Sequence, residues 1–451
     1  MAKNAEDRYQ SAWGLKTDLE FVQTHWQANS KDFIPGERDR TCELLIPQKL
    51  YGRVQEVATL IAAFERASQG MCVPVFVSGY SGIGKSMLIN EIHKPIVRQR
   101  GYFIAGKFDQ FKRNIPYASI IQAFQSLMHS LLTENQDSLQ EWREKLHAAL
   151  GNNGQIVVDF IPEVELIIGK QRPVQKLGLT ETQNRFNLVF REFVRVFTQK
   201  EHPLVIFLDD LQWADVASLK LMQLLICDPD SQYLLLIGAY RDNEVETFDG
   251  ASLHPLMQTV EEIQQTGIVV DRIVVKPLDL TCVNQLLCDT FAQPETAQIQ
   301  ELASLLFNKT GGNPFFLTQM LKTLQQELLV FDTPLEKGGW QWNIEQIQTV
   351  GITDLGVVEL MARNICKLPK STQACLTYAA CIGDRFKLDV LASVTQKTVL
   401  EIADDLWTAL QQGLILPLNK DSDGATKELG CSYNKLHSPK TSLIKCQLIG
   451  I

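Results

Sequence analysis

The sequence predicts an α/β fold in which a parallel β-sheet lies between two layers of helices. Three observations favour this fold. A short apolar run at residues 73–77 leads into a glycine-rich loop and then into a helical pattern. A second apolar run, at residues 204–208, ends in two adjacent aspartates. Apolar runs and helical patterns alternate along the chain, as they do where helices connect parallel strands.

The glycine-rich loop has the spacing of a phosphate-binding loop, G-x-x-x-x-G-K-S, over residues 79–86. Glycines let backbone N–H groups curl around a phosphate, and the following helix presents its positive N-terminal end to the same anion. The lysine can reach the β- and γ-phosphates, and the serine can ligate Mg²⁺. A simple strand-to-helix turn is the weaker interpretation, because the strand, loop and helix all agree. The predicted nucleotide-binding residues here are Gly79, Gly82, Gly84, Lys85, Ser86 and Met87.

The run Leu204-Val205-Ile206-Phe207-Leu208 is typical of a central parallel strand, with Asp209 and Asp210 at its C-terminal end. Ligands of open α/β sheets bind at that edge. Asp209 is therefore predicted to hold Mg²⁺, and Asp210 to orient or activate the attacking water. The alternative is a strand that simply stops at a polar turn.

A third apolar run, residues 233–240, ends at Arg241. A guanidinium at a strand end can reach a γ-phosphate and report its presence. It can equally form a salt bridge to a neighbouring acid, and the sequence leaves both interpretations open.

The remaining elements follow in order. Residues 1–28 have a helical pattern, 29–46 form a polar linker, and 102–105 form the second strand. A polar and helical insertion at 132–180 precedes a helix whose phenylalanine stripe is interpreted as core packing. The last strand lies within 268–275. The stretch Gly311-Gly312-Asn313-Pro314 ends one helix and starts another, because asparagine caps helices and proline suits their first turn.

Composition limits the class of protein. The 451 residues exceed what a single core holds and suggest two or three domains. A hydrophobic content of 45% with 21% charged residues is typical of a globular protein, and a net charge of −9 argues against a nucleic-acid partner. No apolar run is long enough to span a bilayer, which predicts no membrane partner. Ten cysteines lack metal-ligand spacing and indicate reduced thiols, and the charged N-terminus is unlike a signal peptide, so we expect a cytoplasmic location.

Several motifs in order resemble the signal-transduction ATPases with numerous domains, a branch of the AAA+ ATPases. The motifs are Gly52-Arg53, the loop at 79–86, Asp209-Asp210-Leu211-Gln212-Trp213-Ala214-Asp215, Tyr240-Arg241-Asp242 and Gly312-Asn313-Pro314-Phe315. Within that group the chain is similar to the ATPase segment of cyanobacterial-type multi-sensor kinases, which also carry a serine/threonine kinase, a GAF domain and a histidine kinase. The partners expected from the resemblance are those domains or other proteins.

The resemblance implies a three-layer P-loop NTPase sheet of strand order 5-1-4-3-2, which binds ATP or ADP with Mg²⁺. It implies an ATPase core at residues 47–275, a helical lid at 276–335, a winged-helix-like domain at 350–437 and an atypical tail at 438–451. Asp209 would coordinate the ion together with Ser86, and Arg241 would act as a sensor. Arg53, in the motif that opens the core, would help to bind the nucleotide, Pro314 would lie against the adenine, and His437 would touch the phosphates.

The chain also departs from the family pattern. Val54 replaces an acid that usually follows Gly-Arg, and Pro439 would interrupt a helix expected after His437. Residues 1–28 are similar to the last helices of a kinase C-lobe, yet the chain has no H-R-D and no D-F-G, and residues 248–250 carry the latter's letters in the wrong order. We expect no protein kinase activity from this chain alone, and we expect it to be a fragment.

The leading functional expectation is a weak ATPase that acts as a nucleotide switch, slow because no arginine finger from a partner is identifiable. A DNA-binding initiator-type AAA+ ATPase is the alternative, since such proteins join this core to a winged helix. Between residues 352 and 418, however, there are six basic and seven acidic residues, whereas a DNA-recognition surface should be basic. A third possibility is an inactive fragment that only binds nucleotide.

Overall fold

The computed structural model describes residues 12–25, 44, 46–110, 113, 115–175, 178–246, 253–327, 330–332, 339–349, 357–383, 385–411, 414–418 and 445–448. The chain divides into two compact units, Met1–Gly52 with Pro277–Ile365, and Arg53–Lys276 with Cys366–Ile451. His437, Pro439, residues 248–250 and most of the predicted linker at 29–46 lie outside the described residues. In the described part of the chain, no helix has the length and apolar character needed to cross a membrane.

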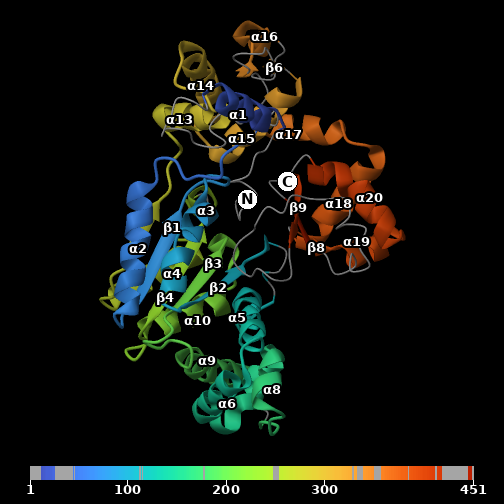
Figure 1. The fold of residues 1–451 in the computed structure, drawn as a ribbon. Coiled ribbons are helices and arrows are strands. Elements are labelled where there is room, and N and C mark those ends of the chain that lie inside the picture. The colour runs from blue at the N-terminus through green and yellow to red at the C-terminus, as the bar shows by residue number, and fades with distance from the viewer. Residues whose placement is uncertain are drawn as a thin grey trace. The chain divides into compact units, whose positions relative to one another are not determined.

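A five-stranded parallel sheet forms the centre of the second unit (Figure 1). The strands are β1 (Cys72–Ser78), β2 (Tyr102–Lys107), β3 (Leu204–Asp209), β4 (Leu234–Tyr240) and β5 (Asp271–Val274). Their order across the sheet is β2-β3-β4-β1-β5, which confirms the predicted order 5-1-4-3-2 read from the other edge. The second strand runs two residues further than its apolar run, to Lys107, and the last strand is shorter than expected.

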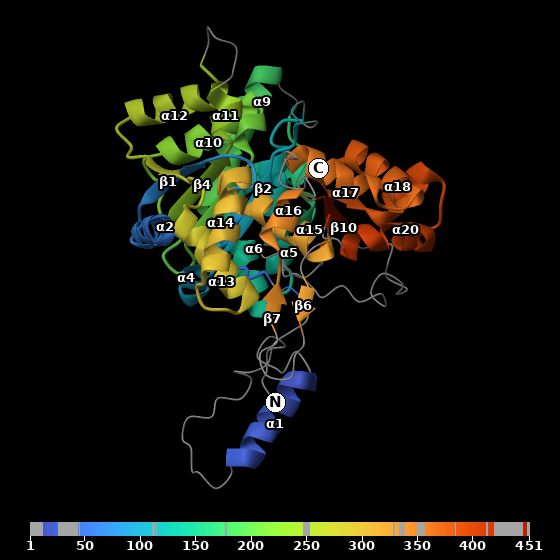
Figure 2. The ribbon, with the colours of Figure 1, turned by 90° about the horizontal axis from the view of Figure 1, so that it is seen from above.

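Helices cover both faces of this sheet and give it three layers (Figure 2). One face carries α2 (Val54–Ser68), α3 (Lys85–Asn90) and α4 (His93–Arg98); the other carries α5 (Ala118–Leu131), α9 (Leu179–Arg195), α10 (Val216–Cys227) and α12 (Pro255–Gln265). Strand side chains alternate between the faces. Phe76, Ile104 and Ile206 join the large core of the second face. On the first face, Phe103 of β2 lies against His93 and Phe207.

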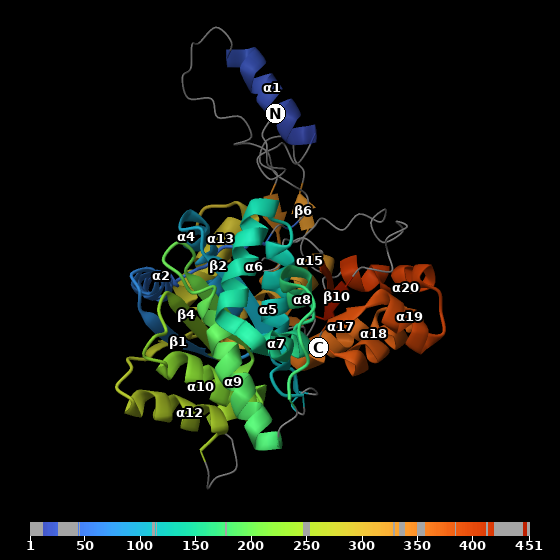
Figure 3. The ribbon, with the colours of Figure 1, turned by 90° about the horizontal axis from the view of Figure 1, so that it is seen from below.

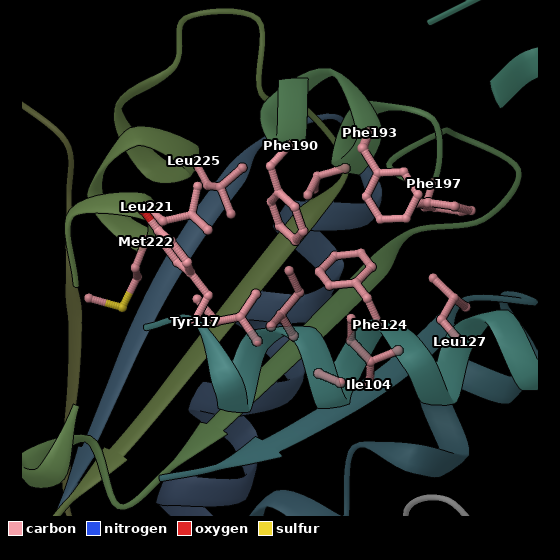
Figure 4. Packing of buried hydrophobic residues seen from close by; sticks show 14 of the residues in the cluster. Ile104, Tyr117, Phe124, Leu127, Phe190, Phe193, Phe197, Leu221, Met222 and Leu225 are labelled. Atoms are coloured by element: carbon pink, nitrogen blue, oxygen red, sulfur yellow. The ribbon is translucent and has the colours of Figure 1, made fainter. Parts of the chain in front are cut away.

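A helical lobe occupies the predicted insertion (Figure 3). It consists of α6 (Gln136–Leu150), the short 3-10 turn Gly151–Asn153, α7 (Gly154–Phe160) and α8 (Glu163–Ile168), which pack with α5 and α9. Phe190 and Phe193 of α9, together with Phe197 just after it, surround Phe124 of α5. Their ring centroids lie 5.2, 5.4 and 6.3 Å from that of Phe124 (Figure 4). The prediction that the aromatic stripe is core packing is confirmed.

The first unit contains a helical core. Its elements include α1 (Ala12–His25), α13 (Leu280–Phe291), α14 (Ala297–Thr310), α15 (Pro314–Glu327), β6 (Val330–Asp332), β7 (Gly339–Gln341), α16 (Ile344–Thr349) and most of α17 (Val357–Cys366). The predicted helix break is confirmed: Gly311 ends α14 in a left-handed conformation, and Asn313 Oδ1 accepts a hydrogen bond from the Phe315 N–H. A Cβ at Gly312 would lie 2.1 Å from the Leu278 carbonyl oxygen, so glycine is required there.

The C-terminal segment combines three helices with a small sheet. The helices are α18 (Lys370–Ile382), α19 (Leu388–Thr395) and α20 (Val399–Gln411). The strands β8 (Arg385–Lys387), β9 (Ile415–Leu418) and β10 (Lys445–Leu448) form an antiparallel sheet of order β8-β10-β9. The middle strand thus comes from the predicted atypical tail at 438–451.

Candidate nucleotide-binding site

The loop between β1 and α3 depends on glycine at several positions. Gly79, Gly82 and Gly84 have φ angles of 150°, 72° and 100°, which L side chains rarely adopt. A Cβ at Gly79 would also approach the Val275 carbonyl oxygen to 2.7 Å, because Val275, just after β5, lies beside the end of β1. The backbone therefore takes a curled path that few other residues could follow.

Lys85 lies folded back along the loop at the start of α3, with only 8% of its surface exposed. Its Nζ donates hydrogen bonds to the carbonyl oxygens of Gly79 (2.7 Å) and Tyr80 (3.0 Å). Burial lowers the pKa of Lys85, and the nearby Asp209 and Asp210 act in the opposite direction. The ammonium thus lies in a poorly hydrated position, where an added phosphate would be a favourable partner.

Ser86, in the first turn of α3, and Asp209, at the end of β3, lie close together. Ser86 Oγ donates to Asp209 Oδ2 across 3.4 Å, although the residues are 123 positions apart in the chain. Burial raises the pKa of Asp209, while the charges of Lys107 and Lys85 lower it. A hydroxyl next to a carboxylate is the donor set that Mg²⁺ takes beside a nucleotide, so the residues present fit that ion.

Asp210 follows in a left-handed backbone conformation, with φ of 55°, and its side chain is buried. Its Oδ1 accepts from Gln212 Nε2 at 2.9 Å and pairs with Arg241 Nε at 3.3 Å, and its Oδ2 lies 3.5 Å from Lys107 Nζ. Lys107 and Gln212 were missed by the sequence analysis. Lys107 ends β2 and pairs in register with Asp209 of β3. The signal in the sequence that could have indicated it is a lysine at the end of the second strand.

Arg241 forms ion pairs with neighbouring acids, which is one of the two interpretations that the sequence left open. It contacts Asp210 and also pairs with Glu244 Oε1 at 2.8 Å. Its guanidinium carbon lies 4.8 Å from the centre of the Trp213 ring, a cation–π distance. The same guanidinium stands at the carboxyl edge of the sheet beside Asp210, where a phosphate would compete for it.

The other predicted residues lie in different surroundings. Arg53 is buried, and its guanidinium donates to the Lys276 carbonyl oxygen and lies 3.4 Å from Glu56 Oε1. Met87 and Ser86 are exposed on the first turn of α3. Pro314 begins α15 in the other unit. His437 lies outside the described residues. The nucleotide-binding roles of Arg53, Pro314 and His437 stay predictions, as do those of the loop at 79–86.

The sheet order and the loop geometry define a P-loop nucleotide triphosphatase fold, with the phosphate-binding loop after β1 and the paired acids after β3. In agreement with this class, residues 49–237 match the model of a protein family described as an AAA ATPase domain.

Two curated relatives extend the similarity over most of the chain. "Hybrid signal transduction histidine kinase G" of Dictyostelium discoideum is 32% identical over 484 aligned positions, covering 88% of this chain and 14% of that protein. "Peroxide stress-activated histidine kinase mak3" of Schizosaccharomyces pombe is 20% identical, covering 93% of this chain and 21% of that protein. The chain thus spans about a seventh to a fifth of the length of these relatives.

Solved structures with a detectable likeness include two archaeal proteins. Cdc6p of Pyrobaculum aerophilum is 12% identical, with a TM-score of 0.37, and the match covers 84% of this chain and 92% of that one. Orc1 of Aeropyrum pernix in complex with DNA is 13% identical, with a TM-score of 0.36, and the match covers 83% of this chain and 87% of that one.

Proposed function

We propose that this chain binds Mg-ATP, hydrolyses it slowly and acts as a nucleotide switch within a multidomain signalling kinase. One observation carries the proposal: Lys85, Ser86 and Asp209 lie at one edge of the sheet, with Ser86 Oγ 3.4 Å from Asp209 Oδ2. Residues separated by more than a hundred positions meet where a polyphosphate and its ion would need them.

The loop and its lysine would bind the phosphates. The N–H groups of the curled backbone and the N-terminus of α3 suit the β-phosphate, and Lys85 suits the β- and γ-phosphates. Ser86 and Asp209 would hold Mg²⁺, which neutralises charge on the β- and γ-phosphate oxygens when bound.

Asp210 is the group we assign to the attacking water. The water oxygen bonds to the γ-phosphorus, the bond from that phosphorus to the β–γ bridging oxygen breaks, and the water's proton passes to the Asp210 carboxylate. ADP and inorganic phosphate are the products. Gln212, Arg241 and Lys107 already engage both oxygens of that carboxylate and would compete with the water for them, which supports slow turnover.

Arg241 is the residue we assign to sensing the γ-phosphate. It shares its guanidinium between Asp210 and Glu244, and a γ-phosphate would compete for it as a third anion. ATP and ADP would therefore leave the β4–α11 junction, with α11 at Asp242–Glu246, in different states. A ligand shifts such an equilibrium only through its differential affinity for the two states.

The wider organisation of the protein belongs to the same proposal. We assign an ATPase core to residues 47–275, a helical lid with Pro314 to 276–335 and a winged-helix-like domain to 350–437. The order α18, β8, α19, α20 and β9 supports the last assignment, with β8 and β9 joined through β10 of the tail at 438–451. The names of the two relatives support a role beside kinase domains, with those domains or other proteins as partners.

The experiment is an Asp209→Asn substitution, with steady-state ATP turnover and ATP affinity measured at several Mg²⁺ concentrations. We expect Mg²⁺-dependent turnover to fall by roughly 100-fold or more, with weaker but measurable ATP binding, because the ion loses a carboxylate ligand. Asp159→Asn, an exposed acid of α7, is the matched control and should behave as the wild type. Undiminished turnover in Asp209→Asn would remove this residue from the site.

A further inference from the structure

The side chain of Gln212 is a buried amide at the carboxyl edge of the sheet. It lies in the 3-10 turn Leu211–Trp213 that follows Asp210, and only 2% of its surface is exposed. Its Nε2 donates to Asp210 Oδ1 at 2.9 Å, and its Oε1 accepts from the backbone N–H of Arg241 at 3.1 Å. One carboxamide therefore joins the acid that follows β3 to the residue that follows β4.

Chemistry fixes which way this amide points. A carboxylate oxygen only accepts hydrogen bonds and a backbone N–H only donates, so the amide nitrogen must face Asp210 and the amide oxygen must face Arg241. Glutamate would keep the acceptor but present an oxygen to the carboxylate. Methionine would fill a similar volume and leave both buried groups without this partner, which is costly.

The backbone of Gln212 is anchored as well. Arg113 Nη2 donates to the Gln212 carbonyl oxygen at 2.9 Å, and the buried His254 also hydrogen-bonds to the Gln212 backbone. Because the turn is held from outside, the side chain of Gln212 can act as a fixed point. Asp210 needs such a point, since its left-handed backbone places a non-glycine residue in a sparsely populated region.

We infer that Gln212 is a positioning residue, whose carboxamide fixes the Asp210 carboxylate relative to the backbone of Arg241. The inference rests on the proposed function. It predicts a much larger effect on hydrolysis than on nucleotide affinity. Among the described residues, the contacts of Gln212 run to Asp210, Arg113, His254 and only the backbone N–H of Arg241, and none runs to the loop at 79–86.

The test is a double-mutant cycle in the full chain with Gln212→Met and Asp210→Ala. Gln212→Met should lower kcat by about 10- to 100-fold through misplacement of Asp210, with KM and ATP affinity within about twofold of the wild type. In the Asp210→Ala background, Gln212→Met should change kcat by less than about twofold, because the residue it positions is gone. Gln212→Glu should not restore kcat.

A second cycle measures the thermal unfolding midpoint of the same four proteins, without nucleotide. The loss caused by Gln212→Met should be smaller when Asp210 is already alanine, because the two side chains share one hydrogen bond. The matched control is Gln223→Met on α10, whose amide also donates to a carboxylate, that of Glu262, at 2.9 Å. This control should leave kcat unchanged.

The outcomes separate the inference from the proposed function. Equal losses of kcat in both Asp210 backgrounds, or a rise in KM that accounts for the loss, would overturn the positioning role. A wild-type chain that neither binds nor hydrolyses ATP would overturn the proposed function, and the midpoint cycle then decides the inference: coupled losses support the Gln212–Asp210 contact, and additive losses overturn it.

Discussion

At the scale of residues, the candidate site depends on a few positions that set the backbone path of the loop or place a charge beside it. Gly79 combines a φ of 150° with a close approach to the Val275 carbonyl oxygen, and this conformation leads the chain into the loop. Lys85 then lies over the loop's own carbonyl groups. A bound phosphate would offset the cost of burying its ammonium.

Gly79→Ala should therefore damage both stability and nucleotide binding. The added Cβ would meet a backbone oxygen, and the strained conformation costs roughly 1–3 kcal/mol of unfolding free energy. Gly267→Ala is the control, because it also has a positive φ, of 86°, but open space around its Cβ. Urea unfolding and ATP titration should show both variants destabilised and only Gly79→Ala impaired in binding; normal binding in Gly79→Ala would contradict this account.

The sequence was sufficient for the residues of this loop and for the paired acids, because each lies in a local pattern of strand, loop and helix. It was insufficient for Lys107 and Gln212. Lys107 reaches Asp210 only because β2 and β3 pair in a register that aligns Lys107 with Asp209, about a hundred residues later. No local spacing encodes that register, and nothing marks Gln212 as more than a turn residue.

At the scale of elements, apolar runs predicted the strands and a helical period of apolar side chains predicted the helices, of which α9 is the clearest case. Phe190 of α9 is fully buried and meets Phe124, Phe186 and Phe193. The helical period was visible in the sequence. The three helices of the lobe at 136–168 were not individually predicted, because their polar residues hide the period and their faces are defined only by packing against α5 and α9.

Phe190→Ala should lower the free energy of unfolding by about 3–5 kcal/mol, since it leaves a large cavity in the aromatic cluster. Leu188→Ala on the same helix is the matched control: Leu188 is 56% exposed, so the expected change is within about 0.5 kcal/mol. Chemical denaturation measures both. Similar losses from the two variants would contradict the burial pattern.

An ion pair should make the stability of the C-terminal helices depend on pH. Partial burial raises the pKa of Asp405, but hydrogen bonds from Lys397 and Ser371 outweigh burial, so the net shift is downward. Lys397 Nζ lies 2.6 Å from Asp405 Oδ2. A lowered folded-state pKa means that the carboxylate contributes stability above the unfolded value of about 3.9, and that this is lost as the pH falls through the folded value.

Asp405→Asn should therefore have a lower unfolding midpoint than the wild type near pH 6, and the difference should shrink as the pH falls below about 4. Lys397→Met should give the same trend, because it removes the other partner. Thermal unfolding monitored by circular dichroism at several pH values measures this. A difference that is independent of pH would contradict the ion pair's contribution.

At the scale of the whole molecule, the P-loop fold is one part of a chain that itself spans about a seventh of its Dictyostelium relative. A switch within such a protein must differ between its ADP and ATP states. Limited proteolysis of the chain with Mg-ADP or with a slowly hydrolysed Mg-ATP analogue should give different cleavage rates, because only the second offers a γ-phosphate to Arg241. Identical patterns with both nucleotides bound would contradict the switch.

The most direct test of the central claim is calorimetric titration of ATP into the wild-type chain and into Lys85→Ala. We expect the substitution to weaken binding by at least about 10- to 100-fold, because a charged hydrogen bond contributes roughly 1.5–3 kcal/mol. Lys94→Ala, an exposed lysine of α4, should bind as the wild type, and far-ultraviolet circular dichroism should be unchanged in both variants. Unaltered ATP affinity in a folded Lys85→Ala chain would contradict the assignment of the loop at 79–86 as the phosphate site.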